Sequence, residues 1–367
     1  MFNSDNSVPV RSMSVNFKLP KVAGAMALGL AVGANATQTL TSNHMDHPEA
    51  KIAVSTAFNL PDVGGMELAG MAPGNPFAPK LNPDYVFALD RFRDMLTFWV
   101  MGYRALKIIG DPAAGKTSIV EQWHARMGMP LFIIGCHENM TETDFIGQFV
   151  PQANGTLKWV DSPVMSAYRH GGSVLLDEWN NLNPNAATML NAMLEGYTVT
   201  IPQTGEVVVP HPKVRFYATQ NPIDGKTAVQ GRYVQDAASD DRFMEMEVDY
   251  LPADLETKVV VAAIRKFDKK SEQSVVETTA SNLVKVANEI RKKFRANELV
   301  ENAAYHKPMS TRVLTRWAQL QYAYRNAKGV DPTIYSMHKA FSGASAEMKT
   351  AVEQLIERTI GNTTYAS

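Results

Sequence analysis

The stretch LKIIGDPAAGKTS, residues 106–118, decides which fold the rest of the chain is expected to adopt. Its apolar start, residues 106–109, has the composition of a buried strand. Two glycines with four residues between them then precede Lys116 and Thr117, which is the spacing of a P-loop, and a helical pattern begins at once. The glycines let the backbone bend so that consecutive N–H groups point at one phosphate, and the helix directs its positive end there too.

A P-loop predicts that the chain binds a nucleoside triphosphate, which we take to be ATP, together with Mg²⁺. Lys116 is expected to reach the β- and γ-phosphates, and Thr117 to place its hydroxyl on the metal ion. The alternative is a glycine-rich turn that carries a surface lysine. On the P-loop interpretation, the residues that contact the nucleotide are Gly110, Asp111, Pro112, Ala113, Ala114, Gly115, Lys116, Thr117 and Ser118.

Two carboxylates follow a second apolar run. Residues 173–176 have the composition of a buried strand, which delivers Asp177 and Glu178 at its carboxyl end, where ligands bind in parallel α/β sheets. Asp177 is expected to hold Mg²⁺, mostly through water, and Glu178 to polarise the attacking water. A further predicted strand begins at Val214 and ends in Asn221, which is able to orient that water. The alternative for Asn221 is a turn made by the Asn-Pro pair.

The composition bounds the class of protein. With 367 residues, 45% of them hydrophobic and 20% charged, the chain fits a globular protein with one large or two to three ordinary domains. A net charge of -1 provides no whole-chain field for nucleic acid or an acidic membrane. No apolar run reaches the roughly 18 residues of a membrane span. The single cysteine, Cys136, fits a reducing, cytoplasmic location. With only His137 and Glu138 beside it, Cys136 makes a poor metal site.

Residues 1–80 differ from the rest of the chain. They are rich in Ser, Asn, Ala, Gly and Met with weak periodicity, and residues 66–80 have the glycine and proline content of a linker. The uncharged stretch 22–36 resembles a signal peptide, and the alternative is a loose Ala/Gly segment in a flexible arm. We favour the flexible arm, because export would place a nucleotide-binding protein where ATP is scarce.

Periodicity predicts an α/β region followed by helices. Apolar residues at helical spacing predict helices at 84–103 and 119–127, on either side of the P-loop. Alternating patterns predict hairpins at 144–160 and 197–209. The remaining predicted elements are strands at 130–135 and 244–248, and helices at 163–170, 184–195, 253–267, 274–294, 310–324 and 344–360.

The order of these parts resembles that of an AAA+ ATPase. After the P-loop come an Asp-Glu strand, a hairpin, an Asn strand, Asp-Arg-Phe at 241–243 and Ser-Thr-Arg at 310–312. The hairpin before the Asn strand and the insertion at 144–160 are similar to the MoxR group. The motifs CHE at 136–138, WVDSPV at 159–164 and QTGEVV at 203–208 resemble the activator ATPases of Rubisco and nitric oxide reductase, CbbQ and NorQ. The motifs FYATQN at 216–221, DR at 241–242, LP at 251–252 and MSTR at 309–312 resemble the ATPase subunit of aerobic cobaltochelatase, CobS.

This resemblance implies a fold and domain boundaries. It implies an α/β class fold, with a P-loop AAA+ core that has a parallel sheet and inserted hairpins at 81–251. A small all-α lid domain at 252–367 is expected to follow, and the arm and linker at 1–80 to precede.

The resemblance also implies roles for three further catalytic residues besides Lys116 and Glu178. Asn221 is similar to the sensor-1 residue, and Arg312 to the sensor-2 arginine that closes the lid on the phosphates. Arg242 lies where this group places an arginine finger, which acts on the nucleotide of the neighbouring subunit. Two departures are noted: Trp179 is bulky for its position, and the acidic run of Asp236, Asp240 and Asp241 leaves the partner of Arg242 open.

The leading hypothesis is a hexameric, Mg²⁺-dependent ATPase of the MoxR group that remodels or activates a partner protein. The resemblance implies a partner with a von Willebrand factor A domain, and a task such as metal insertion into a tetrapyrrole or maturation of another enzyme. One alternative is a DNA-acting helicase- or translocase-like AAA+ motor, against which the near-neutral charge argues. The other is a scaffold that binds ATP but barely hydrolyses it, against which the complete set of catalytic residues argues. We expect neither nucleic acid nor a membrane as a partner.

Overall fold

The structure is a computed structural model of the chain, and it describes residues 44–60, 65–222, 233, 235–297 and 305–361. The signal-like stretch at 22–36 lies outside the described residues.

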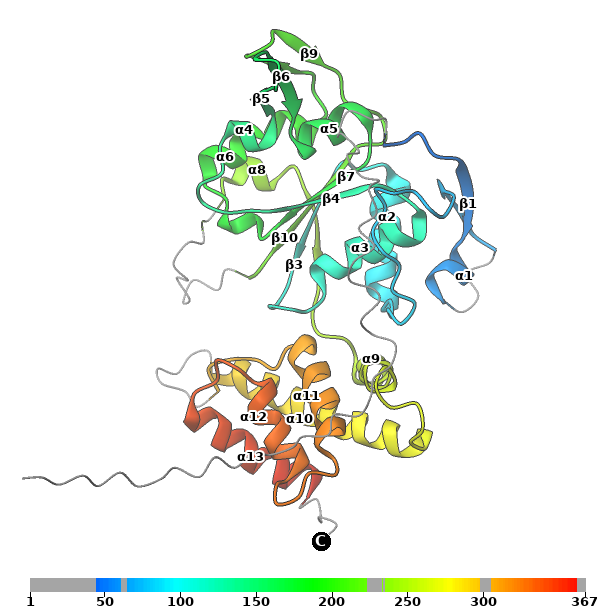
Figure 1. Cartoon of the computed structure of the whole chain (residues 1–367), viewed down its shortest axis with the longest axis vertical. Coiled ribbons are helices and arrows are strands. Elements are labelled where there is room, and N and C mark those ends of the chain that lie inside the picture. Colours follow the sequence, from blue (N-terminus) through cyan, green and yellow to red (C-terminus); the bar gives the residue numbers. More distant parts are fainter. Residues whose placement is uncertain (1–43, 61–64, 223–232, 234, 298–304, 362–367) are drawn as a thin grey trace, which may run out of the picture. The chain divides into compact units, whose positions relative to one another are not determined.

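A five-stranded parallel sheet forms the centre of the α/β region, as the sequence predicts (Figure 1). In the order β11-β3-β10-β7-β4, its strands are β11 (Met244–Glu247), β3 (Ala105–Ile109), β10 (Arg215–Gln220), β7 (Ser173–Asp177) and β4 (Leu131–Gly135). The register pairs Gln220 with Ile109, and Gly135 with Asp177. Because all five strands point the same way, the P-loop, the two carboxylates and Asn221 meet at one edge of the sheet.

Both faces of the sheet are buried, which is typical of parallel sheets and explains the continuous apolar runs. On one face, Leu106 and Ile108 pack with α2 (Leu89–Met101) and α3 (Lys116–Met127). On the other face, Phe216 and Ala218 pack with the short helices α4 (Glu142–Phe145), α5 (Pro163–His170), α6 (Pro184–Met189) and α7 (Asn191–Glu195). The single helix predicted at 184–195 is thus divided at Leu190.

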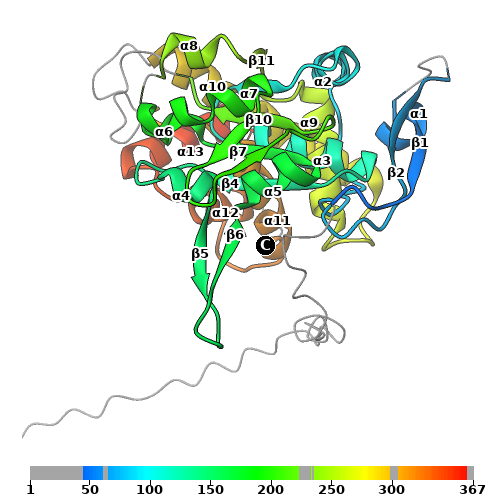
Figure 2. The same ribbon diagram turned by 90° about the horizontal axis from the view of Figure 1, so that it is seen from above.

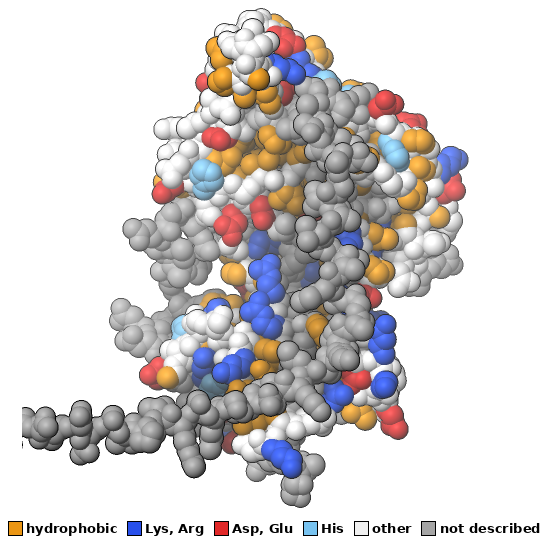
Figure 3. Space-filling model, viewed as in Figure 1, with side chains coloured by type: hydrophobic (Ala, Val, Ile, Leu, Met, Phe, Trp, Pro, Cys, Tyr) orange, Lys and Arg blue, Asp and Glu red, His pale blue; other side chains and the backbone are white. Residues whose placement is uncertain are grey.

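Both predicted hairpins are present. Strand β5 (Gly147–Pro151) pairs antiparallel with β6 (Leu157–Asp161), and β8 (Val199–Ile201) with β9 (Glu206–Val208). Figure 2 shows the β5–β6 hairpin projecting away from the sheet and its helices. Phe149 and Leu157 of this hairpin are exposed, and Figure 3 shows hydrophobic side chains at the surface of this end.

Arg169 of α5 joins the two hairpins. Its guanidinium pairs with Asp161 of β6 at 2.8 Å and donates to Glu206 of β9 at 3.1 Å. The hairpins are therefore held to each other as well as to the core.

Residues 44–60 and 65–80 belong to the folded core, so the expectation that they form part of a flexible arm and linker is wrong. Strand β1 (Glu49–Ala53) pairs antiparallel with β2 (Glu67–Met71), and α1 (Val54–Phe58) lies between them in the chain. Phe58 is 2% exposed, and its ring packs among those of Phe87, Phe92 and Trp123.

The glycine content of this segment reflects close packing. A Cβ at Gly70 would lie 2.6 Å from the carbonyl oxygen of Met127, the last residue of α3. A composition that is common in linkers therefore serves here to bring β2 against a helix, a distinction that composition alone does not make.

The C-terminal helices form a core of their own, in agreement with the predicted all-α lid. They are α9 (Ala253–Arg265), α10 (Gln273–Asn297), α11 (Thr311–Tyr324), α12 (Pro332–Ala340) and α13 (Ala346–Ile360). Helix α12 is missing from the sequence-based prediction, although it carries a start signal. The carboxylate of Asp331 accepts hydrogen bonds from the N–H groups of Thr333 and Ile334, and Pro332 occupies the first helical position.

Replacing Phe58 by Ala tests whether the N-terminal segment stabilises the folded chain. Removal of a buried aromatic side chain typically costs about 3–5 kcal/mol, so we expect Phe58→Ala to lower the free energy of unfolding by that amount in a denaturant titration. Leu81→Ala is the control at a position that is 52% exposed, and it should change that energy by less than about 0.5 kcal/mol. Equal unfolding midpoints for both variants would show that α1 does not pack on the core.

His124 of α3 makes stability depend on pH. Its side chain is fully buried, Nδ1 donates to the carbonyl of Val120 at 2.8 Å, and Nε2 has no hydrogen-bond partner among the described residues. Burial, which the nearby charge of Arg215 reinforces, lowers the pKa of His124 from 6.5 to about 4. Between pH 6.5 and about 4, His124 is therefore neutral in the folded chain and protonated in the unfolded chain.

We accordingly expect the free energy of unfolding to decrease as the pH falls from 6.5 to about 4. His124 contributes a slope of about 1 kcal/mol per pH unit in this window, because only the unfolded state is protonated there. His124→Gln should flatten the dependence by that amount in denaturant titrations at several pH values, whereas His137→Gln, at an exposed position, should leave it unchanged. An identical slope in wild type and His124→Gln would contradict this assignment.

Candidate nucleotide-binding site

The backbone conformation of the loop between β3 and α3 requires small residues. A Cβ at Gly110 would lie 2.0 Å from the carbonyl oxygen of Val248, so a side chain there would displace the chain that follows β11. Gly115 adopts a φ of 97° and Ala113 a left-handed φ of 57°, which is strained for a residue other than glycine. The loop turns tightly into the start of α3, where backbone N–H groups and the positive helix end form an anion site.

Lys116, the first residue of α3, is only 9% exposed. Its ammonium group donates to the carbonyl oxygens of Gly110 at 2.6 Å and Asp111 at 2.9 Å, and to the side-chain oxygen of Asn221 at 2.9 Å. The P-loop carbonyls and the side chain of Asn221, which follows β10, thus fix the position of the Lys116 ammonium group. A cation held in this way is placed to neutralise phosphate charge in the loop.

Asp177 connects three elements through one carboxylate oxygen. Its Oδ1 accepts a hydrogen bond from the hydroxyl of Thr117 at 2.8 Å and another from the hydroxyl of Thr219 at 2.5 Å. Hydroxyl and carboxylate oxygens are ligands that Mg²⁺ prefers. The donor set of Thr117 and Asp177 therefore fits this ion, and Thr219 orients the carboxylate.

Glu178 has a left-handed backbone conformation, with φ 60° and ψ 49°, at the start of a 3-10 turn (Trp179–Asn181). Its N–H donates to the hydroxyl of Thr219 at 2.9 Å, and its carboxylate accepts a hydrogen bond from the side-chain amide of Asn181 at 2.6 Å. Strained backbone of this kind occurs preferentially at functional sites. Both ends of Glu178 are oriented, as a general base requires.

A pocket of about 300 Å³ brings most of the predicted site residues together. It is lined by Pro112, Ala113, Gly115, Lys116, Thr117, Ser118, Asp177, Glu178, Thr219, Gln220, Asn221 and Arg312. Three predicted nucleotide contacts, Gly110, Asp111 and Ala114, do not line it. The carbonyls of Gly110 and Asp111 aim Lys116 instead, and the carbonyl of Ala114 accepts a hydrogen bond from Arg91 at 3.3 Å.

Among the five predicted catalytic residues, only Arg242 lies outside this pocket. Its guanidinium pairs with Glu195, at the end of α7, at 3.2 Å, and donates to the carbonyl of Ala238 in α8 (Ala237–Asp240). The acidic run beside it is engaged elsewhere in part, because Asp240 pairs with Lys107 of β3 at 3.1 Å.

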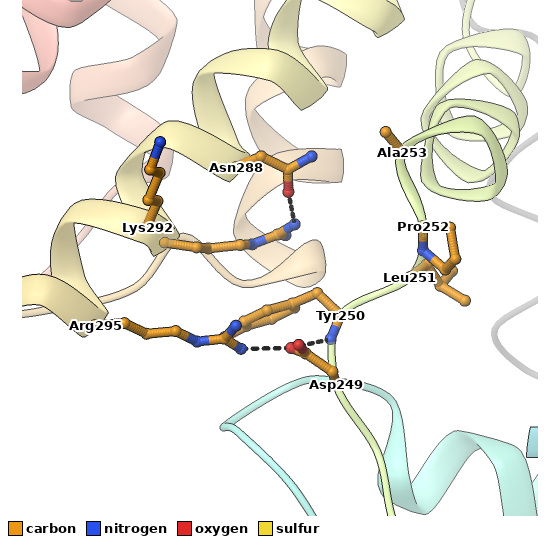
Figure 4. A pocket seen from close by; sticks show the side chains of 9 residues that line it. Asp249, Tyr250, Leu251, Pro252, Ala253, Asn288, Lys292 and Arg295 are labelled. Carbon is orange, nitrogen blue, oxygen red and sulfur yellow. Dashed lines mark hydrogen bonds and ion pairs between the residues drawn. The ribbon is translucent and has the colours of Figure 1, made fainter.

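A second pocket, of about 380 Å³, lies where the α/β region continues into the lid (Figure 4). Arg295 of α10 points into this region and pairs with Asp249 at 2.5 Å and with Asp111 of the P-loop at 3.1 Å. Although partial burial opposes it, the hydrogen bond and charge of Arg295 hold the pKa of Asp249 below its usual range. The hydroxyl of Tyr250 donates to the carbonyl of Pro112 at 3.2 Å. The Tyr250 contact thus connects the P-loop to the chain that leads into the lid, and the Arg295 contact connects the P-loop to α10 of the lid.

A buried ion pair extends this connection to α11. The guanidinium of Arg291 lies 3.9 Å from the centre of the Tyr250 ring and donates to both carboxylate oxygens of Glu256, at 2.7 and 2.8 Å. Glu256 is fully buried and also accepts from the hydroxyl of Thr311 at 2.6 Å. Since Thr311 directly precedes Arg312, these contacts position the start of α11, from which Arg312 reaches the nucleotide pocket.

Burial, together with the charges of Asp177 and Glu178, raises the pKa of the Cys136 thiol to about 12, which makes it a poor metal ligand. No cluster of three or more His, Cys, Asp or Glu side chains in the described residues is arranged to hold a metal ion. None of the described helices combines the length and hydropathy that a bilayer crossing requires.

Comparison with known families agrees with this geometry. Residues 105–243 match the AAA domain of the dynein-related subfamily, and residues 269–359 match the C-terminal region shared by CbbQ, NirQ and NorQ. The first match spans the P-loop, both carboxylates, Asn221 and Arg242, and the second spans most of the lid. The chain contains an AAA domain followed by a C-terminal region of the CbbQ, NirQ and NorQ type, and it is an ATPase related to CobS and CbbQ.

Individual relatives of this ATPase share about a quarter to a third of its residues where they align. The aerobic cobaltochelatase subunit CobS of Sinorhizobium sp is 25% identical over 283 residues, which cover 74% of this chain and 80% of CobS. Protein CbbQ of Hydrogenophilus thermoluteolus is 28% identical over 185 residues, 48% of this chain and 62% of CbbQ. Midasin of Dictyostelium discoideum is 30% identical over 213 residues, 58% of this chain but only 3% of Midasin.

Two contributors to the site are absent from the sequence-based prediction, Thr219 and Asn181. A signal for Thr219 exists, because it precedes Asn221 by two residues in the predicted strand, and side chains two residues apart in a strand lie on the same face. No pattern singles out Asn181, since the turn that folds it back to Glu178 is set by the left-handed conformation of Glu178 itself.

Replacing Thr219 by Val removes one hydroxyl while retaining the shape of the side chain. Loss of a residue that orients a metal ligand typically costs about 10- to 100-fold in metal affinity or activity, so we expect Thr219→Val to raise the Mg²⁺ concentration for half-maximal ATPase activity by that factor. Thr188→Val is the control, because the Thr188 hydroxyl donates to Pro184 on the exposed side of α6. Equal Mg²⁺ titrations for Thr219→Val and wild type would refute a role of Thr219 in orienting Asp177.

Proposed function

We propose that the chain hydrolyses ATP with Mg²⁺ in a head-to-tail ring of identical subunits and uses the cycle to remodel a partner protein. The observation that carries this proposal is the position of Arg242. Lys116, Glu178, Asn221 and Arg312 line one pocket, whereas Arg242 lies outside it. In this proposal, a second copy of the chain supplies its Arg242 to the nucleotide pocket as a further cation. A head-to-tail contact of this kind repeats from copy to copy, and it closes a ring when the rotation between neighbouring copies allows closure.

In the proposed reaction, Glu178 accepts a proton from the attacking water while Asn221 orients that water. Lys116 and Arg312 neutralise the charge that develops on the phosphate oxygens. Thr117 and Asp177 would hold Mg²⁺, which would supply further positive charge at the phosphates. The finger from the neighbouring copy contributes on the order of 10³ to 10⁵ in rate.

The pairing of Arg242 with Glu195 is compatible with this role. The two side chains are 26% and 40% exposed, and exposed ion pairs typically contribute only about 0–1 kcal/mol. Glu195 therefore orients Arg242 in the single chain without preventing its transfer to a neighbouring nucleotide.

The finer features of the proposal come from relatives. The resemblance to the MoxR group favours a hexamer and a partner with a von Willebrand factor A domain. The relative CobS is a cobaltochelatase subunit, and a role in metal insertion would fit this relationship. Because ATP is the proposed substrate, the proposal places the chain in the cytoplasm.

The ATPase rate per subunit, measured against protein concentration, tests the ring. We expect the rate to rise with concentration for wild type, because each pocket needs a neighbouring Arg242. Arg242→Ala should lose on the order of 10³-fold in kcat, and Glu178→Gln should lose hydrolysis while it still binds ATP and assembles.

A rate that is independent of concentration, or full activity of Arg242→Ala, would contradict assembly-dependent hydrolysis. Stimulation of the rate by DNA would favour the helicase-like alternative. The Glu178→Gln ring, trapped with ATP, then serves as bait for the partner, since it cannot complete the cycle.

A further inference from the structure

Lys107 is a charged residue on an otherwise apolar face of the sheet. It lies in the middle of β3, three residues before Gly110, and is only 4% exposed. The register places Ala218 opposite Lys107, and Ala105 and Phe216 lie on the same face; all three belong to the core on that side. Burying an ammonium group costs several kcal/mol unless it is paired, so its partners are the informative feature.

Two carboxylates neutralise Lys107, and they come from different elements. Glu245, 3.2 Å away, belongs to β11 and is the direct register partner of Lys107 on the adjacent strand. Asp240, 3.1 Å away, is the last residue of α8 and precedes Arg242 by two residues. Glu245 thus satisfies the lysine within the sheet, whereas Asp240 connects the sheet to the segment that carries Arg242.

The segment from α8 to Phe243 has a second attachment to the catalytic strands. Phe243 packs its ring against that of the fully buried Trp179, with 5.5 Å between centres, and Trp179 directly follows Glu178. The N–H of Phe243 also donates to the carbonyl of Asp240 at 3.1 Å. Arg242 is therefore flanked by one anchor on β3, which leads into the P-loop, and another on the turn after β7.

We infer that Lys107 is a positioning residue for Arg242: through Asp240, it fixes the arginine that this chain presents to the nucleotide of its neighbour. This inference rests on the proposed function. In the pair of Lys107 and Asp240, the lysine is buried and lies on β3, an interior strand of the sheet. The pair therefore connects the segment that carries Arg242 to the strand that leads into the P-loop of the same subunit. Loss of the pair should displace the finger and leave the P-loop of the same chain intact.

Lys107→Met tests this role, because methionine retains the length and burial of the side chain without its charge. We expect kcat to fall on the order of 10²-fold, since a misplacement of about 1 Å can have that effect. The dissociation constant for ATP should stay within about twofold of wild type, because the pocket of the same chain is unchanged. Asp240→Asn should behave in the same way and is the milder change at a partly exposed position. Glu245→Gln is the control, since it leaves the pair of Lys107 with Asp240 in place.

Mixed rings distinguish a displaced finger from a damaged fold. Lys107→Met subunits keep an intact pocket, and Glu178→Gln subunits keep an intact finger but cannot hydrolyse ATP. When the two are mixed, a Lys107→Met pocket beside a Glu178→Gln neighbour receives a correctly placed Arg242. We expect the ATPase rate per Lys107→Met subunit to rise toward the wild-type value as the proportion of Glu178→Gln increases. Asp240→Asn should recover in the same mixture, which keeps the test available if Lys107→Met does not fold.

The mixture of Arg242→Ala with Glu178→Gln distinguishes a failure of the positioning role of Lys107 from a failure of the proposed arginine finger, Arg242. If that mixture recovers activity while neither the Lys107→Met nor the Asp240→Asn mixture does, the positioning role is wrong and the finger itself stands. If the Arg242→Ala mixture also fails to recover, the proposed finger is wrong, and the positioning role is overturned with it. Full activity of unmixed Lys107→Met would likewise overturn the inference.

Discussion

The parallel hydrogen-bonded register of β3, β10 and β7 is the constraint on which the site depends. It places the ends of three strands side by side, so that the P-loop, Asn221 and Asp177 meet although they are far apart in the sequence. The hydrogen bond from Lys116 to Asn221 and those from Thr117 and Thr219 to Asp177 exist because of this alignment. A slip by one residue would reverse which side chains face each core, so burial on both faces fixes the register.

The same edge of the sheet is also connected to the lid and to the segment that carries Arg242. Toward the lid, Arg295 and Tyr250 contact the P-loop, and the buried pair of Arg291 and Glu256 reaches the start of α11. Toward the surface that carries Arg242, Lys107 and Trp179 hold the segment around α8. Both connections begin within a few residues of the proposed phosphate contacts. The strand ends that carry the proposed phosphate contacts are thus connected both to the start of α11, where Arg312 lies, and to the segment that carries Arg242.

The inserted hairpins are attached to this machinery less directly. They extend from the face of the sheet opposite α2 and α3, and Arg169 joins them to each other. Exposed hydrophobic residues at this end, such as Phe149 and Leu157, are available to contact a partner. The nucleotide pocket and the projecting surface are therefore separate parts of one α/β region.

By itself, the sequence determined the P-loop, the parallel α/β class, both hairpins and the all-α lid, because each depends on local signals: glycine spacing, apolar runs, alternation and helical periodicity. It also identified Asp177, Glu178 and Asn221, since strand ends in a parallel sheet meet at one edge. Only the tertiary structure decided that residues 44–60 and 65–80 pack into the core, because close packing and flexibility use the same small residues, as Gly70 shows. The same holds for Thr219, Asn181 and Lys107. Thr219 and Lys107 act on partners that are distant in the chain, and Asn181 contacts Glu178 because of the left-handed backbone of Glu178. Sequence periodicity does not predict contacts of either kind.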